Sequence, residues 1–117
     1  MGIIARMKSV SGGRAATVIP VATTTTIPDD SDNIFLTGTA TVTSLVANKM
    51  THGRTVRLYQ SDSGTTTLTN SPGTTTAGQM DLGGLDSSNL VLGPTDVIRL
   101  TLRVDGTWVR TSNPVNN

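Results

Sequence analysis

The sequence predicts an all-β protein: a small antiparallel β-sandwich or barrel with an extended N-terminal arm. The first reason is composition, because threonine makes up about a fifth of the chain, glutamate is absent, and all eight acidic residues are aspartate. Threonine and valine favour strands, whereas glutamate, alanine, leucine and lysine favour helices. The second reason is spacing, because short alternating segments are separated by turn signals roughly every 8–12 residues.

The C-terminal segment DVIRLTLRVDGTWVR, residues 96–110, gives the clearest element. Asp105-Gly106 is a hairpin signal, since glycine tolerates a positive φ. A two-residue loop would place Trp108 opposite Arg103, whereas a three-residue loop ending in Gly106 would place it opposite Leu102, in the core. We favour the second, because a chain with only three aromatic residues needs its largest side chain inside. The hairpin core is then Leu100, Leu102 and Trp108. One face carries Ile98, Leu100, Leu102 and Val104, and the other Arg99, Thr101, Arg103 and Asp105.

The alternative register has its own consequence. If Trp108 lay on the surface, Arg99, Arg103 and Arg110 would line a contact between subunits and meet aspartates of a neighbour. As exposed ion pairs, they would contribute little to stability individually.

Alternation and turn residues predict the remaining elements. Val56 and Leu58 are expected to point inward, with Arg57 and Tyr59 on the opposite face. The segment that follows is expected to return as the hairpin partner of the strand that contains them. The expected strands are Ala15–Val21, Thr23–Ile27, Ile34–Val46 (one strand, or two joined near Gly38), Arg54–Gln60, Thr65–Asn70 and two short pieces within Met80–Leu92.

Two parts of the chain are distinguished by charge. Residues 1–33 contain Arg6, Lys8 and Arg14, but no acid before Asp29. Their short apolar patches have no helical period, so we interpret 1–33 as an extended N-terminal arm and 34–117 as the β-domain. Within the arm, Pro20 is compatible only with an edge strand or a bend.

The chain contains little that could do chemistry, and we predict no catalytic, cofactor or metal site and no enzyme activity. The lack of cysteine excludes disulfides and thiolate metal sites. His52, the single histidine, lies in a predicted turn without a triad pattern around it. Asp29, Asp30 and Asp32 could hold a cation such as Ca²⁺, but turn formation explains them more simply.

Nucleic acid, membrane and sugar are not expected as partners. The arm is basic but has no aromatic residue on which bases could stack. No apolar run approaches the ~20 residues that cross a membrane. Thr37, Thr39, Thr41 and Thr43 share one face by spacing, which would suit ice binding if the stripe were repeated, but no internal repeat is evident.

From Ile34 to Asn113 the sequence resembles a module of bacteriophage virion proteins, found in head decorations and fibres. The resemblance lies in IFLTGTATVTSL, GRTVRLYQSDSGTTTLTN and NLVLGPTDVIRLTLRVDGTWVRTSN, taken in this order. It implies a small β-domain, commonly a homotrimer, without catalytic residues. The chain has no shaft repeats and no coiled coil, and it has an arm before the module, which suits a capsid cement protein better than a fibre.

The resulting expectation is a head decoration protein on the capsid exterior of a virion. It would act as a homotrimer and dock on the major capsid protein through the arm, by adding a strand to a sheet edge. The arm contacts expected are Ile3, Ile4, Arg6 and Val10. The alternative is a receptor- or glycan-binding tip of a tail fibre or spike, which would bind through loops such as Ser71–Gly78.

Overall fold

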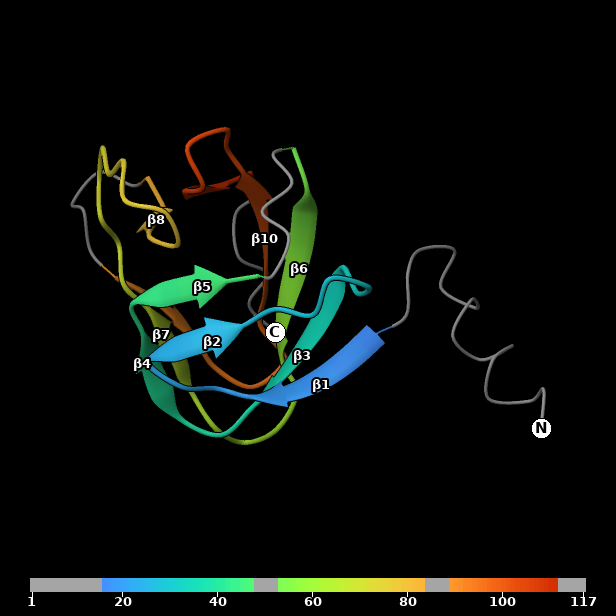
Figure 1. The fold of residues 1–117 in the computed structure, drawn as a ribbon. Helices are drawn as coiled ribbons and strands as arrows, with labels where there is room; N and C mark the ends of the chain where they lie inside the picture. The colour runs from blue at the N-terminus through green and yellow to red at the C-terminus, as the bar shows by residue number, and fades with distance from the viewer. Residues whose placement is uncertain (1–15, 48–52, 84–88, 112–117) are drawn as a thin grey trace, which may run out of the picture.

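The computed structural model describes residues 16–47, 53–83 and 89–111, and these ranges contain strands and turns without a helix (Figure 1). Accordingly, the described residues include no helix that could span a membrane. The strands are β1 (Ala16–Pro20), β2 (Thr24–Thr26), β3 (Asn33–Thr37), β4 (Ala40–Val42), β5 (Ser44–Val46), β6 (Thr55–Gln60), β7 (Thr66–Leu68), β8 (Met80–Asp81), β9 (Leu90–Leu92), β10 (Val97–Leu102) and β11 (Trp108–Arg110).

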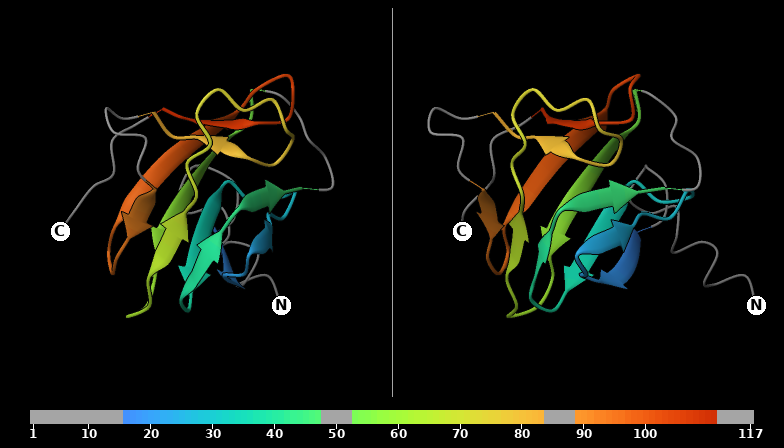
Figure 2. Two further views of the ribbon diagram at one scale, coloured as in Figure 1. Left: turned by 90° about the vertical axis from the view of Figure 1, so that its left-hand side faces the viewer. Right: turned by 60° about the vertical axis from the view of Figure 1, so that its left-hand side comes forward.

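The described strands form three sheets that enclose one core. The largest has six strands in the order β1-β3-β6-β10-β11-β8, and the others are β4-β7-β9 and β2-β5. Figure 2 shows the long strands of the six-stranded sheet as one wall, with the shorter strands of the other two sheets across from it. The prediction of an all-β fold is confirmed.

The predicted antiparallel sandwich or barrel is wrong, because successive windings of the chain stack in a solenoid-like way. Strand β3 lies parallel to β1 and β6 parallel to β3, while β5 stacks on β2 and β7 on β4 in the same sense. Parallel strands need a long connection back to the starting edge. Here strands of the neighbouring sheets supply it in place of a helix. Alternation records which face a residue occupies, but not the direction of the neighbouring strand.

The windings have unequal lengths, which explains why no internal repeat is visible. The offset between stacked residues changes at each step, so no fixed period exists in the sequence. Among the described strands, antiparallel pairing is confined to β7 with β9 and to β10 with β6 and β11. The stacked partners that show the changing offset are Ala16 with Asn33, Asn33 with Arg57, Thr24 with Ser44, and Ala40 with Thr66.

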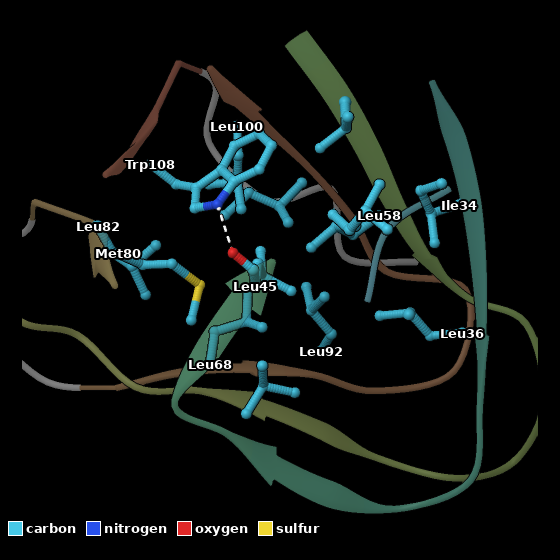
Figure 3. Close-up of a cluster of buried hydrophobic side chains, with 14 of the residues drawn as sticks. Ile34, Leu36, Leu45, Leu58, Leu68, Met80, Leu82, Leu92, Leu100 and Trp108 are labelled. Atoms are coloured by element: carbon cyan, nitrogen blue, oxygen red, sulfur yellow. Dashed lines mark hydrogen bonds between the residues drawn. The ribbon is translucent and has the colours of Figure 1, made fainter. Parts of the chain in front are cut away.

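The core consists of branched aliphatic side chains, one methionine and a single tryptophan (Figure 3). Trp108 is fully buried, and its indole Nε1 donates a hydrogen bond to the carbonyl oxygen of Leu45 on the opposite wall at 3.0 Å. The bond satisfies the polar atom of the ring, which a dry core requires. The other buried apolar residues are Ile27, Ile34, Leu36, Val42, Leu45, Val56, Leu58, Leu68, Met80, Leu82, Leu92, Ile98, Leu100 and Leu102.

The hairpin between β10 and β11 has the predicted three-residue loop. Trp108 pairs with Leu102, which confirms the register that places the indole in the core. The amide of Gly106 donates to the Arg103 carbonyl at 2.9 Å, and Gly106 has a φ of 86°. Val104 was expected on the core face but lies in the loop and is 83% exposed. Alternation stops being informative where the strand ends.

Residues 16–33, which the prediction assigned to the arm together with two short strands, contribute β1 and β2 to the sheets. β1 forms the edge of the six-stranded sheet, as the position of Pro20 suggested, and β2 pairs with β5. Ile27 is 1% exposed and belongs to the core. β1, β2 and Ile27 therefore pack with the rest of the described chain.

The predicted hairpin between Arg54–Gln60 and Thr65–Asn70 is also wrong. β7 pairs with β4 and β9 and belongs to a different wall from β6. Asp62 explains the change of wall, since its carboxylate accepts the amides of Gly38 and Gly64, each at 2.9 Å. These bonds tie the turn after β6 to the bend at Gly38. The chain therefore continues into β7 beside β4, in the three-stranded sheet, and does not fold back along β6.

The threonine stripe is divided by the bend at Gly38, which has a φ of 90°. Thr37 ends β3, whereas Thr41 lies on β4 and pairs with Thr67 of β7. Thr37 and Thr41 therefore belong to different sheets, and the expectation of one continuous face is wrong. The hydroxyl of Thr43 donates to the Thr23 carbonyl at 3.3 Å, so part of the stripe serves the fold.

Candidate functional site: the outer face of the six-stranded sheet

The central strands of the six-stranded sheet alternate between two faces. On β6 the inward residues Val56 and Leu58 are fully buried, whereas Arg57 is exposed and Tyr59 half-buried, as predicted. β3 and β10 alternate in the same way. Because these strands are adjacent, their outward side chains form rows across the sheet, which we call the outer face.

One row is apolar and crosses four adjacent strands. Val18 of β1 pairs with Phe35 of β3, Phe35 with Tyr59 of β6, and Tyr59 with Val97 of β10. The rings of Phe35 and Tyr59 meet edge to face, with centroids 4.9 Å apart and planes at 60°. Val18 is 63% exposed. We call Val18, Phe35, Tyr59 and Val97 the apolar row; it contains two of the three aromatic residues of the chain.

The neighbouring row carries two arginines. Asn33 pairs with Arg57, and Arg57 lies directly opposite Arg99 on β10. Both arginines are exposed. Like charges at directly opposed strand positions destabilise a sheet by a few tenths to about 1 kcal/mol. We call Asn33, Arg57 and Arg99 the arginine row; it places two cations side by side on the outer face.

The next row is polar and ordered by its own hydroxyl groups. The side-chain oxygens of Thr55 and Thr101 lie 2.9 Å apart, and the two residues pair across β6 and β10. Beyond them Thr101 pairs with Val109 of β11, and Val109 with Asp81 of β8. The outer face therefore grades from an apolar row through two cations to hydroxyl groups.

The acidic turn after β2 is structural in the described residues. The Arg54 side chain is 7% exposed, and its Nε donates to Asp32 Oδ1 at 3.2 Å. Its Nη2 also donates to the carbonyl of Pro28 at 2.6 Å. The guanidinium thus holds the turn against β6, which agrees with turn formation as the reason for these aspartates. No group of three potential metal ligands occurs among the described residues.

The loop Ser71–Gly78, the alternative binding element, is braced by hydrogen bonds to the two residues that follow it. Thr74 Oγ1 donates to Gln79 Oε1 at 2.7 Å, and the amide of Ser71 donates to the Met80 carbonyl at 2.7 Å. A side chain at Gly78 would collide with the Ser44 hydroxyl. The loop is therefore anchored to β5 at one end and exposed at Thr75, Thr76 and Ala77.

Two exposed aspartates have a lowered pKa because they cap turns. Backbone amides of Gly64 and Gly38, and then the Gln60 side chain, lower the pKa of Asp62. The Thr107 hydroxyl, followed by the Thr107 amide, lowers the pKa of Asp105. Both carboxylates stabilise turns of the fold and have no role on the outer face.

Several predicted residues cannot be compared with the structure. Ile3, Ile4, Arg6 and Val10, the expected arm contacts, and His52 lie outside the described residues. Of the arginines in the surface alternative, Arg99 is on the outer face, while Arg103 bonds to Thr107 Oγ1 at 2.9 Å within the hairpin. Trp108 is buried, so the condition for that alternative is not met.

Sequence reasoning missed the outer face as a site. Arg57 and Tyr59 were placed on one face, and Arg99 on the polar face of its own strand. Their proximity depends on the pairings β3 with β6 and β6 with β10. The sequence did carry one signal: in β3, β6 and β10 the arginines and aromatic rings alternate with apolar residues that the core buries. No protein-family model and no curated protein sequence matches the chain.

Proposed function

We propose that the protein is a structural virion component that decorates and stabilises the exterior of a bacteriophage capsid. It binds as a homotrimer and docks on the major capsid protein, with residues 1–15 contributing strand addition. The proposal assigns the chain no catalytic role and no cofactor. Its mechanism is adhesion: free energy comes from buried surface and backbone hydrogen bonds.

The observation that carries the proposal is the position of β1. It is the terminal strand of the six-stranded sheet, and among the described strands it pairs only with β3. Its other edge presents backbone groups that another strand can use. Residues 1–15 lead directly into this edge. The chain thus joins its N-terminal segment to the part of the fold best suited to pairing with another protein.

The repeated surface of a capsid explains how small contacts could give tight binding. A lattice presents many copies of the same surface, and a multimeric ligand binds the second and third copies at a high effective concentration. Small individual contacts then give a large combined affinity. The proposed trimer takes advantage of this multiplicity.

The experiment compares two chains for co-sedimentation with purified capsid shells of the phage that carries the protein. Deletion of residues 1–14 leaves β1 and β2 complete, so we expect the truncated chain to fold and to keep its oligomeric mass while losing shell binding. Deletion of residues 1–33 serves as the destabilised control, because it removes β1, β2 and the buried Ile27. Undiminished binding after the shorter deletion contradicts the role of the arm.

The alternative function is recognition of a host receptor or glycan at a fibre or spike tip. The exposed tip of the loop Ser71–Gly78 favours it. Binding of the isolated protein to host cells, lost after Thr75→Ala and Thr76→Ala, would replace the decoration proposal. Presence in purified virions at the copy number of a shell component supports decoration instead.

A further inference from the structure

We propose that the open edge of β1 receives an extended strand of the shell protein, so that the six-stranded sheet continues into its partner. The inference deepens the proposed function and rests on it for the identity of that partner. The contact then has two parts. Residues 1–15 reach the shell, and β1 itself pairs with a shell segment that carries an apolar side chain opposite Val18.

The two end strands of the six-stranded sheet differ in how their edges are covered. At one end the chain closes β8 itself, because Asn70 forms a parallel bridge with Met80 and the amide of Ser71 donates to the Met80 carbonyl at 2.7 Å. At the other end β1 pairs, among the described strands, with β3 alone. Its sequence ATVIP has no charged side chain, which is a common means of blocking an edge. Within the described residues, β1 is therefore the edge of this sheet that is open to a further strand.

The hydrogen bonds beside β1 identify the backbone groups on this open edge. The amide of Val21 donates to the Thr37 carbonyl of β3 at 2.9 Å, so the backbone of Val21 faces β3. Alternate residues of a strand direct their backbone groups to opposite sides, so those of Ala16, Val18 and Pro20 face away from β3. Proline has no N–H. The edge thus offers the N–H groups of Ala16 and Val18 and the carbonyl groups of all three residues.

The side chains of β1 indicate what the added strand must carry. Val18 is 63% exposed and pairs with Phe35, whose ring centroid lies 4.9 Å from that of Tyr59. An apolar residue directly opposite Val18 would extend the apolar row by one strand, and such cross-strand pairs stabilise a sheet. The partner segment is therefore extended, is apolar opposite Val18, and has no proline opposite Ala16 or Val18.

A second copy of the same edge fits less well than a different protein. Two β1 strands related by a two-fold axis through Val18 would place Ala16 opposite Pro20, where the missing N–H leaves a carbonyl without a donor. Such a pair would also close as a dimer, whereas the proposed assembly is a trimer. A segment of another protein has neither restriction.

Hydrogen exchange of the full ¹⁵N-labelled chain tests the inference without any substitution. In the free protein we expect the amides of Ala16 and Val18 to exchange rapidly and that of Ile19, which faces β3, to exchange slowly. With purified capsid shells in excess, exchange at Ala16 and Val18 should slow by about tenfold or more, as measured by NMR after quenching and release.

Two outcomes of the exchange experiment would overturn the inference. Unchanged exchange at Val18 on the shells would show that no strand adds there. Slow exchange at Val18 in the free protein would show that a second copy or residues 1–15 already occupy the edge.

Two proline substitutions provide a matched pair of variants. Val18→Pro removes the donor at the centre of the open edge. Val91→Pro makes the same change on β9, an edge strand of the three-stranded sheet, at a valine that is 55% exposed. Thr65 and Thr69, which flank β7, bond to β4, so Thr67 between them also faces β4 and its partner Val91 faces away from β7.

Both proline variants should fold, because an edge strand tolerates a proline whose missing N–H faces out of the sheet. Val18→Pro should weaken co-sedimentation with shells about tenfold, and Val91→Pro should leave it unchanged. Thermal unfolding of the two variants checks that the difference does not come from stability. Equal shell binding by two folded variants would overturn the inference.

Failure of the inference and failure of the proposed function are distinguishable. If shells bind the full chain but the Val18 amide stays unprotected, the open edge is not a docking site and the decoration function stands. If shells do not bind the full chain, the decoration function is contradicted, and the peptide acetyl-TVTVTVT-amide tests the edge alone. At millimolar concentration it should shift the amides of Ala16 and Val18, whereas an analogue with every amide N-methylated should not. Equal shifts with both peptides, or none with either, would overturn the inference.

Discussion

The two faces of the six-stranded sheet come from the same strands but follow different rules. The inner face contains aliphatic residues and Trp108 at 0% exposure, and each buried side-chain nitrogen or oxygen of the described residues has a partner. The outer face places two arginines side by side and leaves Val18 largely exposed. The inner face supplies the packing that stabilises the fold, whereas the outer face presents charged and aromatic side chains at the surface.

The largest expected effect is on the inner face. Trp108→Ala removes the largest core side chain and its bond to the Leu45 carbonyl, so unfolding free energy should fall by about 3–5 kcal/mol. Denaturant titration measures the loss. Trp108→Phe, which keeps most of the volume but not the bond, should cost less. A loss well under 1 kcal/mol in the alanine variant would contradict the claim that packing on the inner face is the main source of stability.

The next effect concerns a polar side chain on the inner face. Gln60 is 2% exposed; its Oε1 accepts the Thr66 hydroxyl at 2.5 Å, and its Nε2 donates to the Gly38 carbonyl at 3.1 Å. Gln60→Ala leaves these buried groups without partners, and we expect a loss of about 1–3 kcal/mol. Gln60→Glu keeps the shape but replaces the amide donor that faces the Gly38 carbonyl and the Asp62 carboxylate with an acceptor, so it should be at least as destabilising. An alanine variant as stable as wild type would show that water replaces the amide.

The outer face should respond in the opposite direction. Arg57→Thr removes the repulsion from Arg99 and introduces a good strand residue, so stability should rise by up to about 0.5 kcal/mol at low salt. The gain should shrink at high salt, because salt screens exposed charges. Thermal unfolding at two salt concentrations measures both. A clear loss of stability would make the arginine row part of the structural framework and erase the contrast between the faces.

The smallest expected effect is a pH dependence at two turns, outside both faces. The pKa values of Asp62 and Asp105 are lowered on folding, so their stabilisation is present above the unfolded value near 3.8 and is lost as pH falls through the folded values. Unfolding midpoints between pH 6 and 2 should therefore decline at the acid end. Asp62→Asn should show a flatter decline. An identical curve in that variant would show that Asp62 does not contribute to the loss of stability in acid.

The positions of the strands were largely predictable from the sequence, whereas the pairing of one strand with another was not. The burial of Val56 and Leu58 and the exposure of Arg57 follow from a period of two, which is a local property. The register of Trp108 with Leu102 follows from one glycine at the turn. Parallel stacking joins segments far apart in sequence and at unequal spacing, so no local signal reports that β6 lies between β3 and β10.

The same limit explains why the candidate site emerged only from the structure. Phe35, Tyr59, Arg57 and Arg99 lie on three different strands, and each taken alone is an ordinary outward residue. The arm, by contrast, was suggested by charge and by Pro20, but its boundary depended on whether Ile27 was buried. Burial of one residue in a polar segment depends on packing against another winding, and composition does not record it.

The most direct test of the account combines stability and binding in one variant. The chain without residues 1–14 should unfold at the same denaturant concentration as the full chain and should no longer sediment with capsid shells. That result would separate the segment that binds the shell from the strands that stabilise the fold. A variant that unfolds earlier than wild type yet binds shells equally well would contradict the central claim.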